Sequence, residues 1–281
     1  MRKITFYTAG VILTMTTTQA FTQNAASFAQ SSSTYIFLKP VYGFAGNSSK
    51  LNETQAIAQG ITYTRGVYGS YGRGLGLQLG IGKMINSNFG FELIGEYLHG
   101  AKINTSYSSD SSNISGALSE RIKGFLVKPM LVLRNSGDLL SFYSKLGLAI
   151  SVYSRYSADL AANLELGNQS YQITNSEKDN ARPKVGFAAG FGLSFRVSQS
   201  VAITGEVNGQ MIILPPKDGH YTRYISNGKD LLPAMSTNMK SWTYERSIST
   251  AAGDPNKPGT RLYEPANFSY IGISIGITYY L

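Results

Sequence analysis

Apolar and polar residues alternate with a period of two along most of the chain beyond residue 33. Between residues 75 and 82, leucine or isoleucine occupies every odd position and glycine or glutamine every even position. Near the C-terminus, every odd position from 271 to 277 is isoleucine, with small residues between. Such strict alternation places the apolar side chains on one face of an extended strand, because successive side chains point to opposite faces.

Eight segments carry this alternation, and each is 11 to 16 residues long. Strands of soluble domains average about 5–6 residues, whereas about 9–11 residues suffice for a tilted strand to cross a bilayer. The eight predicted strands are therefore long enough to span a membrane. They cover residues 34–45, 74–84, 89–101, 121–134, 139–153, 183–197, 201–214 and 266–281.

The connections between these segments alternate between short and long. Residues 85–88, 135–138 and 198–200 form tight turns, while residues 46–73, 102–120, 154–182 and 215–265 form long loops. This alternation places every long loop at one end, as in bacterial outer-membrane barrels. It predicts an all-β chain that folds as an eight-stranded antiparallel transmembrane up-and-down β-barrel over residues 34–281. Its four long loops are expected to be extracellular.

Charged residues of the predicted strands fall almost entirely on the face that also carries glycine and small polar residues. In a membrane barrel this face lines the lumen, and an eight-stranded lumen is only wide enough to be filled by side chains. Buried charges are costly unless paired, so opposite charges are expected to meet there. Some of them could instead lie in lumenal water near the barrel ends. The predicted interior network comprises Lys39, Glu92, Glu96, Lys128, Lys145, Arg196 and Glu206.

Two kinds of residue refine this prediction. Pro40 and Pro129 fall inside predicted strands, and proline lacks the N–H that a strand ladder requires, so a bulge or local break is expected at each. Aromatic residues near the strand ends are expected to form two bands at the membrane interfaces. The candidates for these bands are Tyr35, Tyr42, Phe89, Tyr97, Tyr153, Tyr156, Phe268, Tyr279 and Tyr280.

The N-terminus has the layout of a secretory signal peptide. Basic residues at positions 2 and 3 precede an apolar run at 4–15 that is too short to span a membrane as a helix. Cleavage is expected after Ala20, with Ala29 as the alternative site. Residues 1–20 are thus the predicted signal, and residues 21–33 a short tail. An amphipathic anchor is the other interpretation of this segment.

The amino-acid composition limits the kinds of functional site that the chain can form. Charged residues make up only 15% of the 281 residues, below the roughly 25–35% of ordinary soluble surfaces. The chain has no Cys and two His, which excludes thiolate chemistry and disulfides and argues against a metal site. We expect no metal, no cofactor and, for an exported chain with a net charge of only +9, no nucleic acid partner.

Residues 34–281 resemble the small eight-stranded outer-membrane barrels, the OmpA/OmpX-like porin-domain family. The most specific element is the final strand, where Gly276 and Tyr279 precede a terminal Leu281 in alternating order. In that family such a strand is the signal read by the barrel-assembly machinery, although a terminal aromatic residue is commoner than leucine. The resemblance implies an outer-membrane location and contact with lipopolysaccharide.

No catalytic residue is predicted. Some barrels similar to this family deacylate lipid A with a His and a Ser two residues apart, but here Ala101 follows His99 at that spacing. Without a hydroxyl there is no nucleophile for the imidazole to activate. His220 lies in the last long loop with no nucleophile identifiable beside it.

The sequence therefore predicts a non-enzymatic outer-membrane protein with a structural or surface role. The long basic loop 215–265 is the candidate for adhesion to, or recognition of, an extracellular partner. A mobile shield is the plainer interpretation of this loop. A narrow passive pore is the main alternative function. A lipid A-modifying enzyme and a soluble exported barrel or sandwich remain further alternatives.

Overall fold

The structure is a computed structural model that describes residues 34–46, 49–58, 61–109, 114–135, 137, 139–166, 169–248 and 254–281. The predicted signal peptide and the tail at 21–33 lie outside these residues. No helix in the described ranges is long and apolar enough to cross a membrane.

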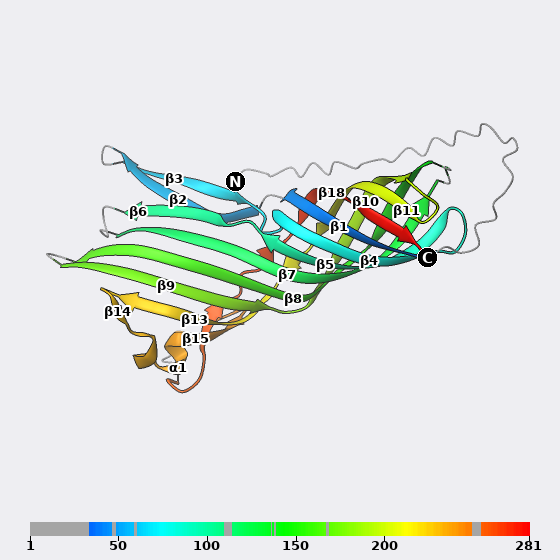
Figure 1. The fold of residues 1–281 in the computed structure, drawn as a ribbon. Coiled ribbons are helices and arrows are strands. Elements are labelled where there is room, and N and C mark those ends of the chain that lie inside the picture. Colours follow the sequence, from blue (N-terminus) through cyan, green and yellow to red (C-terminus); the bar gives the residue numbers. More distant parts are fainter. Residues whose placement is uncertain are drawn as a thin grey trace, which may run out of the picture. The chain divides into compact units, whose positions relative to one another are not determined.

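Eight long strands close into an antiparallel barrel, which confirms the predicted fold class (Figure 1). Each strand pairs with its neighbour in the order below, and the last pairs with the first along nearly its full length. The strands are β1 (Thr34–Ala45), β4 (Gly74–Met84), β5 (Phe89–Gly100), β7 (Ile114–Arg134), β8 (Leu140–Leu166), β10 (Lys184–Arg196), β11 (Val201–Met211) and β18 (Tyr270–Tyr280).

The two barrel prolines interrupt the strand ladder without shifting its register. Pairing between β1 and β18 stops at Leu38 and resumes at Val41. Pairing between β7 and β8 stops at Val127 and resumes at Met130. Each gap spans a proline, which cannot donate a ladder hydrogen bond. The local breaks predicted at Pro40 and Pro129 are thus confirmed.

The segments predicted as long loops are largely β-structure, which differs from the expectation. β7 begins at Ile114 rather than at residue 121, and β8 continues to Leu166 rather than ending at residue 153. Added strands extend this end of the barrel, which we call the extended end. They are β2 (Ser49–Ala58), β3 (Ile61–Gly69), β6 (Ile103–Ser109), β9 (Gln169–Ala181), β13 (Pro216–Ser226), β14 (Lys229–Asp230), β15 (Ser241–Glu245) and β16 (Gly259–Leu262).

The remaining elements are short. Two-residue strands β12 (Ile213–Leu214) and β17 (Ala266–Asn267) pair with each other, and a 3-10 turn η1 (Leu232–Ala234) precedes a single-turn helix α1 (Thr237–Lys240). Opposite the extended end lie the tight turns, where the backbone N–H of Leu281 bonds to the carbonyl of Thr34. Both ends of the barrel sequence therefore meet at this tight-turn end.

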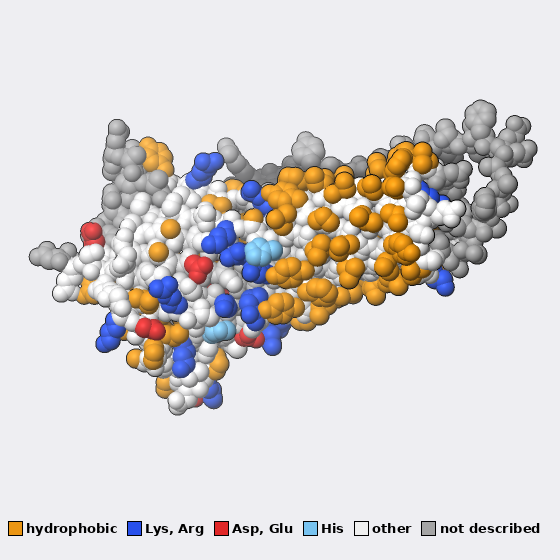
Figure 2. Space-filling view, in the orientation of Figure 1, with side chains coloured by type: hydrophobic (Ala, Val, Ile, Leu, Met, Phe, Trp, Pro, Cys, Tyr) orange, Lys and Arg blue, Asp and Glu red, His pale blue; other side chains and the backbone are white. Residues whose placement is uncertain are grey.

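An apolar belt covers the face of the barrel that Figure 2 shows, and all eight barrel strands carry exposed apolar side chains. Leu79 and Ile275 are 62% and 64% exposed, whereas the charged side chains of Lys39, Glu92 and Lys145 are buried inside the barrel. The outward residues from Ile271 to Leu281 span about 33 Å along the strand at about 3.3 Å per residue. A tilt of about 40° reduces this to about 25 Å of depth, the height of the apolar band in outer-membrane barrels. The barrel is therefore transmembrane.

The inside of the barrel has two chemical zones. Towards the extended end an apolar core includes Leu98, Leu126, Phe268 and Tyr270, all at most 1% exposed. Towards the tight-turn end, the buried charges Lys39, Glu92, Lys145 and Glu206 lie among buried apolar side chains such as Phe37 and Met130. The expectation of two outer aromatic bands is met only in part, because Tyr35, Phe268 and Tyr280 are buried inside the barrel. Tyr42, Tyr97, Tyr153 and Tyr279 do face outward.

Candidate functional site

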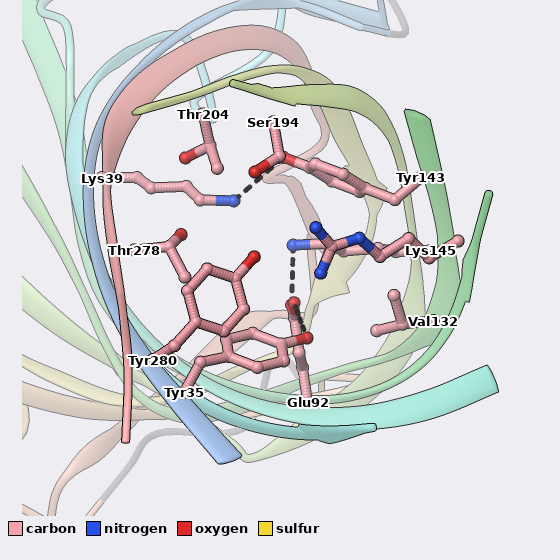
Figure 3. A pocket seen from close by; sticks show the side chains of 11 residues that line it. Tyr35, Lys39, Glu92, Val132, Tyr143, Lys145, Ser194, Thr204, Thr278 and Tyr280 are labelled. Atoms are coloured by element: carbon pink, nitrogen blue, oxygen red, sulfur yellow. Dashed lines mark hydrogen bonds and ion pairs between the residues drawn. The ribbon is translucent and has the colours of Figure 1, made fainter. Parts of the chain in front are cut away.

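Lys145 on β8 points into the barrel, where it forms an ion pair with Glu92 (Figure 3). Its Nζ is 2.6 Å from Glu92 of β5 and 3.0 Å from Glu206 of β11. Lys39 of β1 reaches the same Glu206 oxygen at 2.9 Å. The hydroxyl of Tyr35 donates to Glu92 at 2.8 Å. Four strands thus place two cations and two anions in one buried cluster, which we call the lower cluster.

A second cluster lies nearer the apolar core. Lys128 of β7 is 2.7 Å from Glu96 of β5, whose side chain is fully buried. Gln78 of β4 donates to the same carboxylate, and Tyr270 of β18 donates to it at 2.9 Å. The ammonium group of Lys128 also lies 5.2 Å from the ring centroid of Tyr270. Burial of this pair is offset by several hydrogen bonds, as buried charges require.

Arg196 lies apart from the carboxylates with which the sequence analysis grouped it. Its guanidinium is 5.2 Å from the ring centroid of Tyr280, and Arg134 lies 5.7 Å from the same ring. Within the described residues its Nε has no hydrogen-bond partner. Arg196 is the last residue of β10, at the tight-turn end, so its position along the strand places it below the lower cluster.

The lower cluster leaves little free space in the lumen. The cavity beside it measures about 20 Å³, room for about one water molecule. Its lining includes Tyr35, Lys39, Glu92, Tyr143 and Lys145. Together with the apolar core above it, this packing fills the cross-section of the barrel.

The three residues of the predicted assembly signal lie on the final strand and its end. Tyr279 and Leu281 face outward, 46% and 72% exposed. Gly276 faces inward, where an added Cβ would lie 2.6 Å from Cγ of Lys39. Glycine here leaves room for the lysine stem that reaches the lower cluster. Recognition of this strand by an assembly machinery stays a prediction.

The extended end contains a cavity that the sequence analysis did not foresee. This mouth cavity measures about 660 Å³ and is lined by parts of β2, β7, β8, β9, β15 and β16. Its lining includes the acids Glu120, Glu177, Asp179 and Glu264 and the cations Lys50 and Arg261. A sequence signal was present: Glu120–Arg121 and Glu177–Lys178–Asp179 alternate acid and base with the strand period, so the acids share one face.

Asp179 is the most constrained acid of the mouth cavity. It is 5% exposed and accepts hydrogen bonds from Trp242 Nε1 at 3.1 Å and the Tyr244 hydroxyl at 2.8 Å. Burial raises the pKa of this carboxyl to about 6, although both hydrogen bonds act to lower it. The opposing strand carries Gly219 at this register, and a Cβ there would collide with the carboxylate.

Arg261 lies in the wall of the mouth cavity, and its guanidinium contacts three neighbouring side chains. Its Nη1 is 3.0 Å from Glu177, its Nη2 donates to the Tyr221 hydroxyl at 3.1 Å, and its guanidinium lies 3.3 Å from the Trp242 ring centroid. The nearby Glu177 helps to raise the pKa of Arg261, although burial acts to lower it. This arrangement fixes the wall formed by β13, β15 and β16.

Outside the barrel, two cross-strand rows mark the upper border of the apolar belt. Tyr97, Phe125 and Tyr153 are register neighbours on β5, β7 and β8, and each is at least 39% exposed. Two residues further towards the extended end, His99, Lys123 and Arg155 form the next outward row. We call these the aromatic row and the cation row. Figure 2 shows basic side chains gathered at this border.

The two histidines lie at the extended end in different surroundings. His99 Nε2 lies 2.9 Å from Nη1 of Arg121, and the outward position two residues along the chain is Ala101. His220 is exposed on β13 between Lys178 of β9 and Ser241 of β15, and the Ser241 hydroxyl donates to the carbonyl of Thr237. In the described part of the chain, no three His, Asp or Glu residues gather in a way that could hold a metal ion.

Comparison with known proteins gives fold-level similarity alone. No protein-family model matches the sequence, and no curated protein matches it. Among solved structures it is similar to Neisserial surface protein A (11% identity, TM-score 0.37, covering 89% of this chain and 99% of that one). OprG from Pseudomonas aeruginosa matches at 10% identity and TM-score 0.42 (89% and 96%), and Ail of Yersinia pestis at 14% and 0.31 (89% and 97%). The closed strand order and the apolar belt of the chain itself establish a transmembrane β-barrel.

Proposed function

We propose that this protein is a sealed, non-enzymatic barrel of the bacterial outer membrane that displays a β-structured recognition surface outside the cell. The observation that carries the proposal is the filled lumen beneath a large extended end. Export delivers the chain to the periplasmic side of the outer membrane. In this proposal the tight turns and both ends of the strand sequence stay on that side, as in other outer-membrane barrels, so the extended end faces outward.

The filled lumen favours a surface role over the alternative of a narrow passive pore. An ion crossing the barrel would have to displace the apolar core and then separate Lys145 from Glu92 and Glu206. Breaking one buried pair typically costs about 3–5 kcal/mol. Sustained conduction through such an interior is therefore disfavoured.

Conductance in planar lipid bilayers tests this proposal. We expect the purified full chain to insert without discrete channel openings, while its unheated form migrates faster than the heated form in gel electrophoresis. The mobility shift shows that a closed barrel is present, so silence cannot be attributed to unfolded protein. Repeated openings of uniform conductance from heat-shifting protein would instead support the pore.

The rows at the belt border support lipopolysaccharide as the lipid partner in this role. Aromatic side chains favour the membrane interface, so the aromatic row is expected at headgroup depth. The cation row and Arg121 then lie where the phosphates of lipid A would be. Salt bridges to phosphate suit arginine in particular, because its planar fork can bind two oxygens.

A charge-matched pair of triple variants tests this lipid contact. R121Q/K123Q/R155Q removes three cations at the belt border, whereas K217Q/K229Q/K257Q removes three exposed cations elsewhere at the extended end. We expect only the first to lose co-purifying lipid A in native mass spectrometry, and dephosphorylated lipid A to bind both variants and the parent chain equally. Equal loss from the two triple variants would reduce the effect to net charge.

A further inference from the structure

The mouth cavity has the size of a ligand site and no role in sealing the barrel. Its volume of about 660 Å³ falls within the roughly 300–1,000 Å³ of small-molecule pockets. Ile122 and Leu214 line it and also belong to the apolar core. The cavity therefore ends against the core and does not continue to the lower cluster.

Charge in the lining is unbalanced towards negative. Four acids and two cations give a formal charge of −2. Both cations are already paired: Lys50 bonds to Glu53 of its own strand, and Arg261 bonds to Glu177. Asp179 receives hydrogen bonds from Trp242 and Tyr244, but forms no salt bridge within the described residues. Asp179 thus contributes a carboxylate to the lining that no salt bridge among the described residues neutralises.

The same lining presents aromatic rings beside these carboxylates. Tyr71, Tyr156, Tyr244 and Tyr263 all contribute to it. The first two hold Glu120, since Tyr71 donates to one of its oxygens at 3.3 Å and Tyr156 to the other. Tyrosine faces attract cations at distances within about 6 Å. Carboxylates set among such faces form an environment that suits an organic ammonium group.

We propose that the mouth cavity binds small organic cations of the aliphatic di- and triamine class, with an ammonium group directed to Asp179. The inference rests on the surface role proposed above, because the ligand must reach the extended end from outside. A metal ion fits less well, since the acids are not gathered as a ligand set in the described structure. A neutral saccharide would leave the carboxylate charge uncompensated.

The test is calorimetric titration of the full chain in lipid nanodiscs with spermidine at pH 7.5. We expect saturable binding that D179N weakens about tenfold or more, because a charge-assisted hydrogen bond is lost. D159N is the matched control: Asp159 lies on the same sheet, is exposed on the outer face, and accepts a hydrogen bond from Ser176 at 2.7 Å. It makes the same charge change outside the cavity and should bind spermidine like the parent chain.

Three outcomes would overturn the inference: no saturable heat with spermidine, equal weakening by D179N and D159N, or tighter binding of neutral maltotriose than of spermidine. The heat-shift assay establishes that each variant is a folded barrel before titration. Bilayer conductance reports separately on the lumen, so an unresponsive cavity in a silent barrel overturns this inference and leaves the sealed-barrel role standing.

Discussion

Replacing Lys145 by methionine should destabilise the barrel far more than replacing a lysine on its outside. Methionine keeps most of the side-chain volume but removes the cation that lies 2.6 Å from Glu92 and 3.0 Å from Glu206. Coulomb's law with an effective dielectric constant of about 20 gives about 6 kcal/mol for each contact. Relief of the buried ammonium's desolvation offsets most of this attraction. The net loss in the free energy of unfolding should be about 3–5 kcal/mol, as for other broken buried pairs.

Urea unfolding of the chain in thin lipid vesicles would measure this loss, with gel mobility reporting the folded fraction. K83M is the matched control, because Lys83 is exposed near the tight-turn end of β4. The double variant K145M/E92Q should recover part of the stability, since it removes the carboxylate left without its cation. A loss below about 1 kcal/mol for K145M, equal to that of K83M, would refute the reasoning. The lower cluster would then be hydrated rather than a buried network.

Three further predictions follow from the mouth cavity and the last strand. G219A should push Asp179 and Trp242 apart, weaken spermidine binding and shift the emission of this single tryptophan to longer wavelength; unchanged emission would contradict the close packing at Gly219. Lowering the pH from 8 to 5 should change Trp242 fluorescence with a midpoint near the Asp179 pKa of about 6. The groups that face this carboxyl are Tyr156, Glu177, Tyr244 and Arg261. D179N should abolish the transition. Because this pKa is raised in the folded state, the contribution of Asp179 to stability should be greatest below about pH 4 and lost as the pH rises through about 6. Deleting Leu281 should lower the yield of heat-shifting barrel in cells but not refolding in vitro, where no assembly machinery acts; equal losses in both would mean a purely structural role.

The barrel strands could be predicted from sequence because each has one face in lipid and one in the lumen. That contrast imposes strict alternation, as at 271–277, and alternation also placed Lys39, Glu92 and Glu206 on the inner face. Partner choice was not predictable. Lys145 meets Glu206 through strand stagger and side-chain reach, and Arg196 is too close to the end of β10 to share that cluster.

The extended end escaped prediction for a physical reason. Beyond the apolar belt, both faces of β8 and β9 meet water or polar side chains. The alternation of apolar residues therefore disappears there, although the two strands remain paired. The alternation of charge sign at Glu177, Lys178 and Asp179 was the remaining signal of a strand with two different faces. Parity alone would also have placed Tyr35 inside, since it shares a face with Phe37 and Lys39.

The uninterrupted course of β8 has a mechanical consequence. Its 27 residues run from the tight-turn end, through the belt, to the tip of the extended end, about 90 Å of strand at about 3.3 Å per residue. Its pairing with β7 has one irregularity, a bulge at Val152 near the border of the belt, and β8 continues as a strand across it. A pull on the tip along the strand loads many ladder hydrogen bonds at once, in shear, instead of opening them one after another. A ligand or surface bound at the tip would therefore be connected to the membrane-spanning part through hydrogen-bonded β-structure rather than through a loop.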